Sequence, residues 1–540
     1  MKKKILSPKI SIQDWLKFKP YKVPSSYDTF YLERCREIYD LLGKYDDWLE
    51  DIELAEDEKK NLACILVSYY EDFISEIGIW KGFIDTNQEL YGTYLPFYNL
   101  TDYDPDYLNR QDFAYLVWHF LTKYNEDSTQ APDSGWIMDL AEKLYEALEP
   151  GIDDSPATEM YDKLFSVPDK QDFFGCKEPL QWFAIQSYLI GMDFGRQLRE
   201  LTYEAQYSGK FAPEHIGPVL YAISEPFVFT KRSSYSALNA PEWFSRVARC
   251  SAQKREEIKN LCYWHPGKYR LEETHDKTYI RFTHLYTNQT YLVRRDSFQN
   301  SKKPGTDGMM FQMTLIQWNG DWWLSGIMYS LYDTEKEMKQ YQRSITNTPW
   351  ILPDNLIQTS IKATEEMYQS FVNFFGSPLA QFKNKAEINE KTQAFMEYQA
   401  LTKEPDPQKL ATLQQKFRES AGIKNSAVDY TQEFKGRPDK DFATFFAEGL
   451  GIITFQGVGD IIQLMEKHAL SPKEKVDLFV SLTNGFQPVF ARWLLANYPT
   501  QNIGIPVKSD VDGLQNMEFF WRFYHPEEFD KIYPMTIVVT

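Results

Sequence analysis

The sequence predicts a multidomain α+β protein that is mostly α-helical, with a central five-stranded small β-barrel of the SH3 or OB type. Its 540 residues are too many for one hydrophobic core. Most of the chain spaces apolar residues as helices do, whereas residues 263–332 hold short segments rich in β-formers between turns. The expected regions are a helical region (1–230), a basic loop-and-helix linker (231–262), the barrel (263–332), and a helical region with a terminal strand (333–540).

The first region is expected to be helical throughout. Residues 56–83 place Leu62, Leu66 and Tyr69 at helical spacing. Asn109 is a plausible N-cap for a helix over residues 110–123. The longest helix is expected over residues 179–206, where Gly191 and Gly195 lie four residues apart and allow another helix to approach closely.

The barrel is predicted from five segments and the turns between them. Asn319-Gly320 between two apolar runs is the strongest hairpin signal, because a type I′ turn needs two residues with positive φ. Closure into a barrel removes exposed sheet edges. The expected strands are residues 269–274, 278–286, 290–297, 309–318 and 322–332.

Apolar spacing in the last region favours helices again. Residues 355–375 form a clear amphipathic pattern, and residues 386–402 and 407–421 are more polar but strongly helix-prone. Residues 440–454 and 458–468 also show apolar helix patterns, and residues 532–539 are expected to form a terminal strand.

Charge is distributed unevenly along the chain. The formal net charge is −18, but residues 231–303 contain fifteen Lys and Arg against seven acidic residues, a local balance of +8 that leaves −26 elsewhere. This segment is the predicted contact surface. Its candidate partner-binding residues are Lys231, Arg232, Arg281, Arg294, Arg295, Lys302 and Lys303. The alternative interpretation is that these cations pair with acidic surfaces of the same protein.

No catalytic, metal or cofactor site is predicted. Cys262-x-x-His265 is half of a zinc motif and lacks a second close pair of ligands. Asp102, Asp104 and Asp106 lack the glycine and glutamate that a calcium loop requires. Neither a phosphate-binding loop nor a G-x-S-x-G nucleophile motif occurs, and His119 is expected to be a core or edge histidine.

Five scattered cysteines without a C-x-x-C motif favour a reducing compartment, and no apolar run approaches the length of a membrane span. The basic start of the chain is interrupted by Pro8, Lys9 and Asp14, which is unlike a signal peptide. A cytoplasmic protein without a membrane segment is expected.

Four aromatic motifs in the first half of the chain form a distinctive series. They are Ile12-Gln13-Asp14-Trp15-Leu16 with Lys19-Pro20-Tyr21, Tyr70-Glu71-Asp72-Phe73-Ile74 with Gly78-Ile79-Trp80, Leu90-Tyr91-Gly92 with Leu95-Pro96-Phe97-Tyr98, and Asn109-Arg110-Gln111-Asp112-Phe113 with Trp118-His119. This series resembles a bacterial family of uncharacterised, mostly helical cytoplasmic proteins, a domain of unknown function. The resemblance implies a common helical scaffold and supplies no activity, cofactor or catalytic residue.

The functional expectation is a non-enzymatic interaction or scaffold protein whose contact surface is the barrel with the basic segment. Its partner is expected to be another protein, with the process and the oligomeric state left open. The first alternative is a nucleic-acid or ribonucleoprotein binder, which the net negative charge opposes. The second is an enzyme of unrecognised type, which requires a deep pocket where ionisable groups converge.

Overall fold

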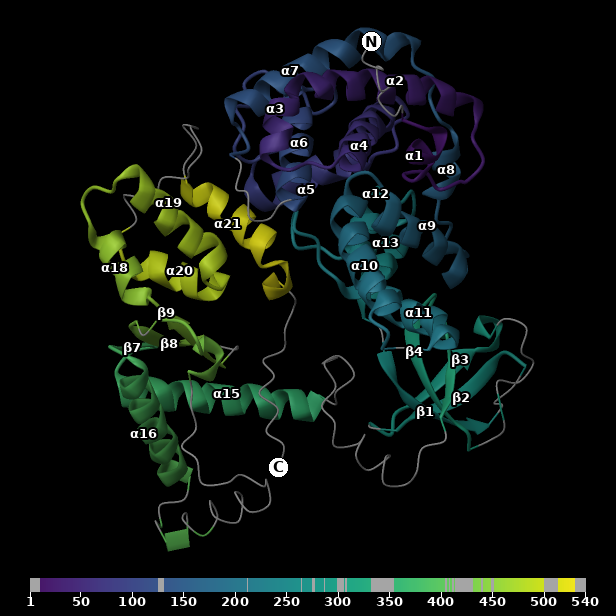
Figure 1. The fold of residues 1–540 in the computed structure, drawn as a ribbon. Coiled ribbons are helices and arrows are strands. Elements are labelled where there is room, and N and C mark those ends of the chain that lie inside the picture. Colours follow the sequence, from purple (N-terminus) through teal and green to yellow (C-terminus); the bar gives the residue numbers. More distant parts are fainter. Residues whose placement is uncertain are drawn as a thin grey trace. The chain divides into compact units, whose positions relative to one another are not determined.

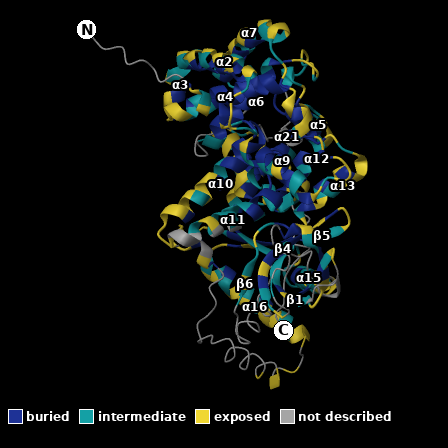
Figure 2. Cartoon of the chain, turned by 90° about the vertical axis from the view of Figure 1, so that its right-hand side faces the viewer, coloured by how far each residue is buried: buried dark blue, intermediate teal, exposed yellow. Residues whose placement is uncertain are grey.

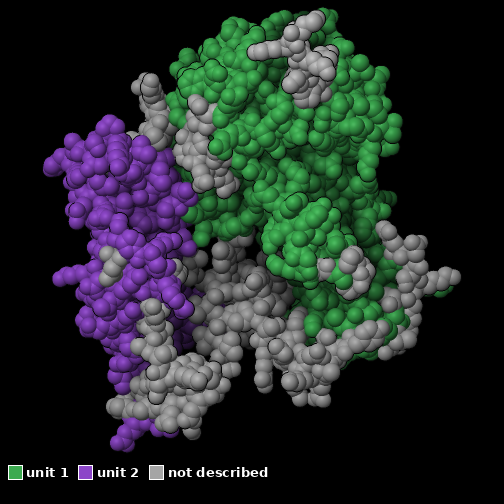
Figure 3. Space-filling view, in the orientation of Figure 1, with its two compact units in different colours: residues 1–344, 506–529 green, residues 345–505, 530–540 purple. Residues whose placement is uncertain are grey.

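The computed structural model describes a mostly helical α+β chain with two β-sheets (Figure 1). The described residues are 10–124, 131–210, 212–263, 265–273, 277–285, 287–298, 305, 308–331, 354–403, 406, 408–409, 412, 431–438, 440–447, 451–499 and 513–529. The chain divides into two compact units, which Figure 3 distinguishes by colour. Unit 1 comprises Met1–Ser344 with Pro506–Phe529, and unit 2 comprises Ile345–Ile505 with Asp530–Thr540. The four predicted regions and their boundaries remain predictions.

The N-terminal part of unit 1 is built from helices. Figure 2 shows buried residues gathered along α4 and α6. The helices are α1 Ile12–Leu16, α2 Ser26–Leu42, α3 Asp46–Asp51, α4 Glu56–Ile74, α5 Ile79–Tyr91, α6 Arg110–Tyr124, α7 Gly135–Leu148, α8 Met160–Leu164, α9 Phe173–Gln186, α10 Ile190–Tyr207, α11 Pro213–Thr230, α12 Ala240–Val247 and α13 Ala252–Lys259.

The long helix expected over residues 179–206 is interrupted, and this part of the prediction was wrong. Helix α9 ends at Gln186 and α10 begins at Ile190. A Cβ at Gly191 would lie 2.9 Å from the carbonyl oxygen of Ile185, and a Cβ at Gly195 would overlap that oxygen. The two glycines therefore let α10 pack against the end of α9, a close approach that helical spacing alone does not reveal.

The sheet of unit 1 has six strands where five were expected. They are β1 His265–Glu273, β2 Tyr279–His284, β3 Thr290–Arg294, β4 Met310–Trp318, β5 Asp321–Leu324 and β6 Tyr329–Leu331. The pairings run β1–β2–β3–β5–β4, β4 also pairs with β1, and β6 extends the sheet from β4. All are antiparallel except the β3–β5 contact at Val293 and Trp322. Asn319 and Gly320 have φ of 54° and 76°, as the predicted hairpin turn requires.

The expected fifth strand, residues 322–332, is split between β5 and β6 by a contact with the helices. Lys177 donates a hydrogen bond to the carbonyl oxygen of Ser325 at 2.5 Å and forms an ion pair with Glu225. The hydroxyl of Ser325 donates to the same glutamate at 2.5 Å. A Cβ at Gly326 would overlap the hydroxyl of Tyr221. The N–H of Ser325 still donates to the carbonyl oxygen of Thr314 in β4 at 2.9 Å, whereas its carbonyl and hydroxyl groups attach the sheet to α9 and α11.

A helix from the far end of the chain completes the core of unit 1. Phe519 of α21 (Gly513–Tyr524) is fully buried. Its ring lies 4.8 Å from that of Phe97 and 5.7 Å from that of Tyr91, measured between centroids. Phe523 of the same helix lies 5.4 Å from Trp118. Unit 1 is therefore discontinuous in sequence.

Unit 2 contains a small sheet that the sequence did not predict. Its helices are α15 Asp354–Phe375, α16 Lys385–Lys403, α18 Val458–Glu466, α19 Pro472–Val480 and α20 Pro488–Asn497, and its antiparallel strands are β7 Leu379–Phe382, β8 Phe442–Ala447 and β9 Gly451–Gln456.

Residues 440–454, expected to be helical, form most of the hairpin of β8 and β9. Every residue of β8 is buried, because both faces of the strand are covered. A continuous apolar run has the same appearance in a buried strand and in a buried helix. Residues 407–421 lie largely, and residues 532–539 entirely, outside the described residues.

The placement of α21 predicts that a substitution near the C-terminus destabilises the N-terminal core. Phe519→Ala should lower the free energy of unfolding of unit 1 by about 3–5 kcal/mol, because it removes a fully buried ring. Urea unfolding followed by tryptophan fluorescence measures the change. The control Tyr203→Ala, which truncates a side chain that is 66% exposed, should change it by less than about 0.5 kcal/mol. Equal effects of the two variants would contradict this packing.

Candidate functional site

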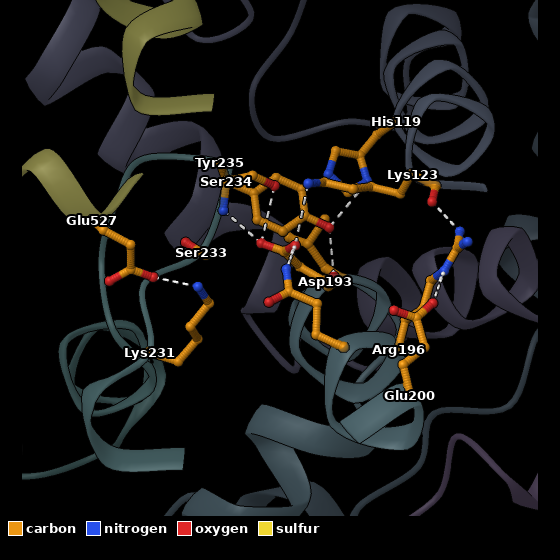
Figure 4. Close-up of polar contacts among 12 residues, drawn as sticks. His119, Lys123, Asp193, Arg196, Glu200, Lys231, Ser233, Ser234, Tyr235 and Glu527 are labelled. Atoms are coloured by element: carbon orange, nitrogen blue, oxygen red, sulfur yellow. Dashed lines mark hydrogen bonds and ion pairs between the residues drawn. The ribbon is translucent and has the colours of Figure 1, made fainter. Parts of the chain in front are cut away.

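Two candidate residues, Lys231 and Arg232, are engaged within the protein. Lys231 forms an ion pair with Glu527, which follows α21 (Figure 4). Arg232 is 8% exposed, donates a hydrogen bond to the carbonyl oxygen of Ala237 and lies 3.2 Å from Glu242. Both side chains therefore hold the loop of residues 231–239 in place.

The same loop is fixed by a buried carboxylate that the sequence did not point to. Asp193 accepts hydrogen bonds from the backbone N–H of Ser234 at 2.5 Å and from its hydroxyl at 3.0 Å (Figure 4). Lys123 lies 3.5 Å from the other carboxylate oxygen, to which Gln197 donates at 3.2 Å. Burial alone would raise the pKa of Asp193, but the charge of Lys123 and the hydrogen bonds hold the pKa below its usual value.

A histidine and a serine lie near this aspartate without forming a catalytic chain. His119 stacks on Tyr235 with ring centroids 4.1 Å apart, and its Nδ1 lies 3.2 Å from the tyrosine hydroxyl. Burial lowers the pKa of His119 to about 3. Ser234 donates to Asp193, and among the described residues no hydrogen bond joins this serine to His119. A nucleophile needs its base within hydrogen-bond reach, so this cluster fixes the loop.

Arg281 and Arg294 lie on the outward face of the hairpin of β2 and β3. Arg294 is directly opposite Tyr279, and Arg281 is opposite Leu292. Because neighbouring residues of a strand point to opposite faces, all four side chains share the face away from the hydrophobic core of the sheet. We call these four residues the hairpin face. Arg294 lies 2.5 Å from Asp296 and 3.6 Å from Asp321.

The remaining three candidate residues, Arg295, Lys302 and Lys303, are not part of the hairpin face. Arg295 follows β3 and is half-buried. Lys302 and Lys303 lie outside the described residues. The structure therefore brings Arg281 and Arg294 onto one face and places Lys231 and Arg232 elsewhere, in the loop next to α12.

Further basic residues of this segment pair with acidic side chains of unit 1. Arg246 lies 2.8 Å from Glu89, and Arg249 forms an ion pair with Asp162. Lys254 is 3% exposed and lies 2.5 Å from Glu257. The partners of Arg246 and Arg249, like Glu527 beside Lys231, lie outside residues 231–303 and neutralise part of the local excess of positive charge. Glu257 lies within that segment and is already counted in its balance.

Metal ligands, cysteine thiols and apolar helices are further features of the described residues that bear on function. No group of three or more His, Cys, Asp or Glu side chains in this part of the chain is placed to hold a metal ion. All five cysteines are described and are free thiols. None of the described helices has the length and apolar character needed to cross a membrane.

Comparison with known proteins identifies a family for the N-terminal half. Residues 9–274 match the model of a family described as protein of unknown function (DUF3843). This match confirms the predicted resemblance to a domain of unknown function over that part of the chain. Neither a curated protein nor a solved structure matches the sequence.

The buried histidine predicts a pH dependence of stability. The unfolded chain protonates His119 near pH 6.5, whereas the folded protein does so only near pH 3. Stability due to this group is therefore present above pH 6.5 and lost as the pH falls. Between pH 7 and pH 5 the wild type should lose about 2 kcal/mol more than His119→Phe, which keeps the ring stacking but does not titrate.

Urea unfolding of unit 1 at the two pH values measures this difference. The control His468→Phe, at an exposed position of unit 2, should behave as the wild type does. An identical pH response of His119→Phe and the wild type would show that His119 titrates alike in the folded and unfolded chains.

Proposed function

We propose that the chain is a non-enzymatic interaction protein of the cytoplasm, and that the sheet of β1–β6 is a small closed barrel that provides its contact surface. The succession of pairings, in which β1 meets both β2 and β4, supports the closed barrel. The single observation that carries the function is the hairpin face, where two arginines stand beside Leu292, which is 37% exposed.

The chemistry of the hairpin face suits a protein partner. Arginine and aromatic side chains are enriched in protein interfaces. The guanidinium of Arg294 lies 5.9 Å from the ring of Tyr279 and 5.7 Å from that of Trp323. The nearby Asp296 and Asp321 hold it in one orientation and neutralise part of its charge. A preordered, partly neutralised arginine favours a mixed polar and apolar surface over a polyanion.

A nucleic-acid partner is the second candidate, favoured by arginines and aromatic rings on one face of a small barrel. The net charge of −18 opposes it. Fluorescence anisotropy with a labelled single-stranded oligonucleotide tests this candidate. Binding that weakens steeply with salt supports it, and absence of binding at low salt excludes it.

The interaction function predicts that a two-residue change on the hairpin face removes the partner. Arg281→Glu with Leu292→Asp replaces a positive and an apolar side chain of this face, so a native partner should lose at least tenfold in affinity. Affinity purification from the native host, with and without nuclease and at near-physiological salt, measures partner recovery.

The matched control for this experiment is Lys143→Glu with Leu201→Asp. It makes the same change of net charge and the same Leu→Asp substitution at two exposed helical positions of unit 1. Circular dichroism confirms that both variants are folded. Equal partner recovery by both variants contradicts the assignment of the surface, and loss of every partner on nuclease treatment favours the nucleic-acid candidate.

A further inference from the structure

The helical part of unit 1 carries a large open groove that shares no residue with the hairpin face. Its volume is about 1460 Å³. Its walls come from the segment around residues 16–22 and from helices α4, α6, α8, α9 and α10. Ligand pockets for small molecules usually measure about 300–1,000 Å³, so this groove has room for a larger ligand.

The charge of the groove is opposite to that of the whole chain. Seven lysines and arginines line it against three glutamates, and no aspartate contributes to the lining. The chain as a whole has a formal charge of −18. A recess lined by one sign of charge concentrates the field inside it, and this recess therefore attracts negatively charged groups.

Three of these cations form no ion pair with a described residue, although the charges of Glu58 and Glu200 act on one of them, Arg199. Lys22, Lys163 and Arg199 are exposed, and no ion pair is formed by any of them. The other four cations of the lining are engaged, in the pairs Lys17–Asp14, Lys19–Glu71, Lys123–Asp193 and Arg196–Glu200. The three unpaired cations therefore retain their charge for a ligand.

The groove also offers apolar surface, and one residue of its lining has an unpaired buried donor. Phe18 and Ile185 are half-buried in its lining, and Met160 is 37% exposed. Trp182 is 9% exposed, and its indole N–H has no hydrogen-bond partner among the described residues.

We infer that the groove binds an acidic segment of another polypeptide that also carries apolar side chains. The three unpaired cations come from three separate elements, namely the turn after α1, helix α8 and helix α10. Such a distribution suits carboxylates spaced along a chain, whereas a single phosphate carries its charge at one point. A polypeptide also supplies apolar side chains that can contact Phe18 and Ile185.

Selection from a displayed library of random 12-residue peptides tests this site on the full-length protein. Peptides recovered on the wild type are expected to be rich in Asp and Glu together with Leu, Ile, Phe or Trp. Fluorescence anisotropy of a recovered peptide then compares the wild type with Lys22→Glu, Lys163→Glu and Arg199→Glu combined. This triple variant should bind at least tenfold more weakly, because three attractive charges become repulsive.

The matched control combines Lys143→Glu, Lys210→Glu and Lys259→Glu, which changes the net charge equally at two exposed positions and one half-buried position outside the groove. It should bind as the wild type does. Failure to recover peptides, recovery of peptides without excess acidic residues, or equal binding by the triple variant overturns the proposal. Competition by inorganic polyphosphate as effective as by the unlabelled peptide overturns it too, since the groove would then recognise charge alone.

Discussion

The helical part of unit 1 depends on carboxylates that are buried together with their donors. Asp72 accepts hydrogen bonds from the backbone N–H groups of Gly78, Ile79 and Trp80 and from the hydroxyl of Tyr188. One side chain of α4 thereby caps α5 and contacts the link between α9 and α10. Burying a carboxylate without such partners costs several kcal/mol. The buried position of Asp72 is therefore stable only in the arrangement of helices that brings all of these donors to it.

The same constraint determines which cations remain available at the surface. Lys19, Lys123 and Lys177 pair with the buried acids Glu71, Asp193 and Glu225. Removing one member of a buried pair leaves an uncompensated charge, which is more damaging than losing a surface ion pair. The internal pairs are therefore structural, and the three buried lysines are not available to a partner at the surface.

The sequence predicted the structural features that neighbouring residues encode. It did not predict the features that depend on contacts between distant parts of the chain. The Asn319-Gly320 turn and the β-rich segments are encoded by neighbouring residues, and the four aromatic motifs identified the family segment. Three features depend on residues that pack against them from elsewhere in the chain. They are the break between α9 and α10, the strand β8, and the packing of Phe519 into the core of unit 1. Likewise, no local pattern indicates that Ser234 will meet Asp193, forty-one residues earlier in the chain.

The groove and the hairpin face differ in whether they lie within residues 9–274, the segment that matches the family model. The match ends at residue 274, just after β1, yet β1 pairs with β4 from His265 to Arg270. The structural unit therefore extends beyond the matched residues, because β1 cannot satisfy its backbone groups without strands that follow them. Every residue that lines the groove lies within residues 9–274, whereas the hairpin face lies wholly outside. The proposed binding of an acidic segment therefore needs only residues that lie within the match, whereas the proposed interaction through the hairpin face needs residues that follow it.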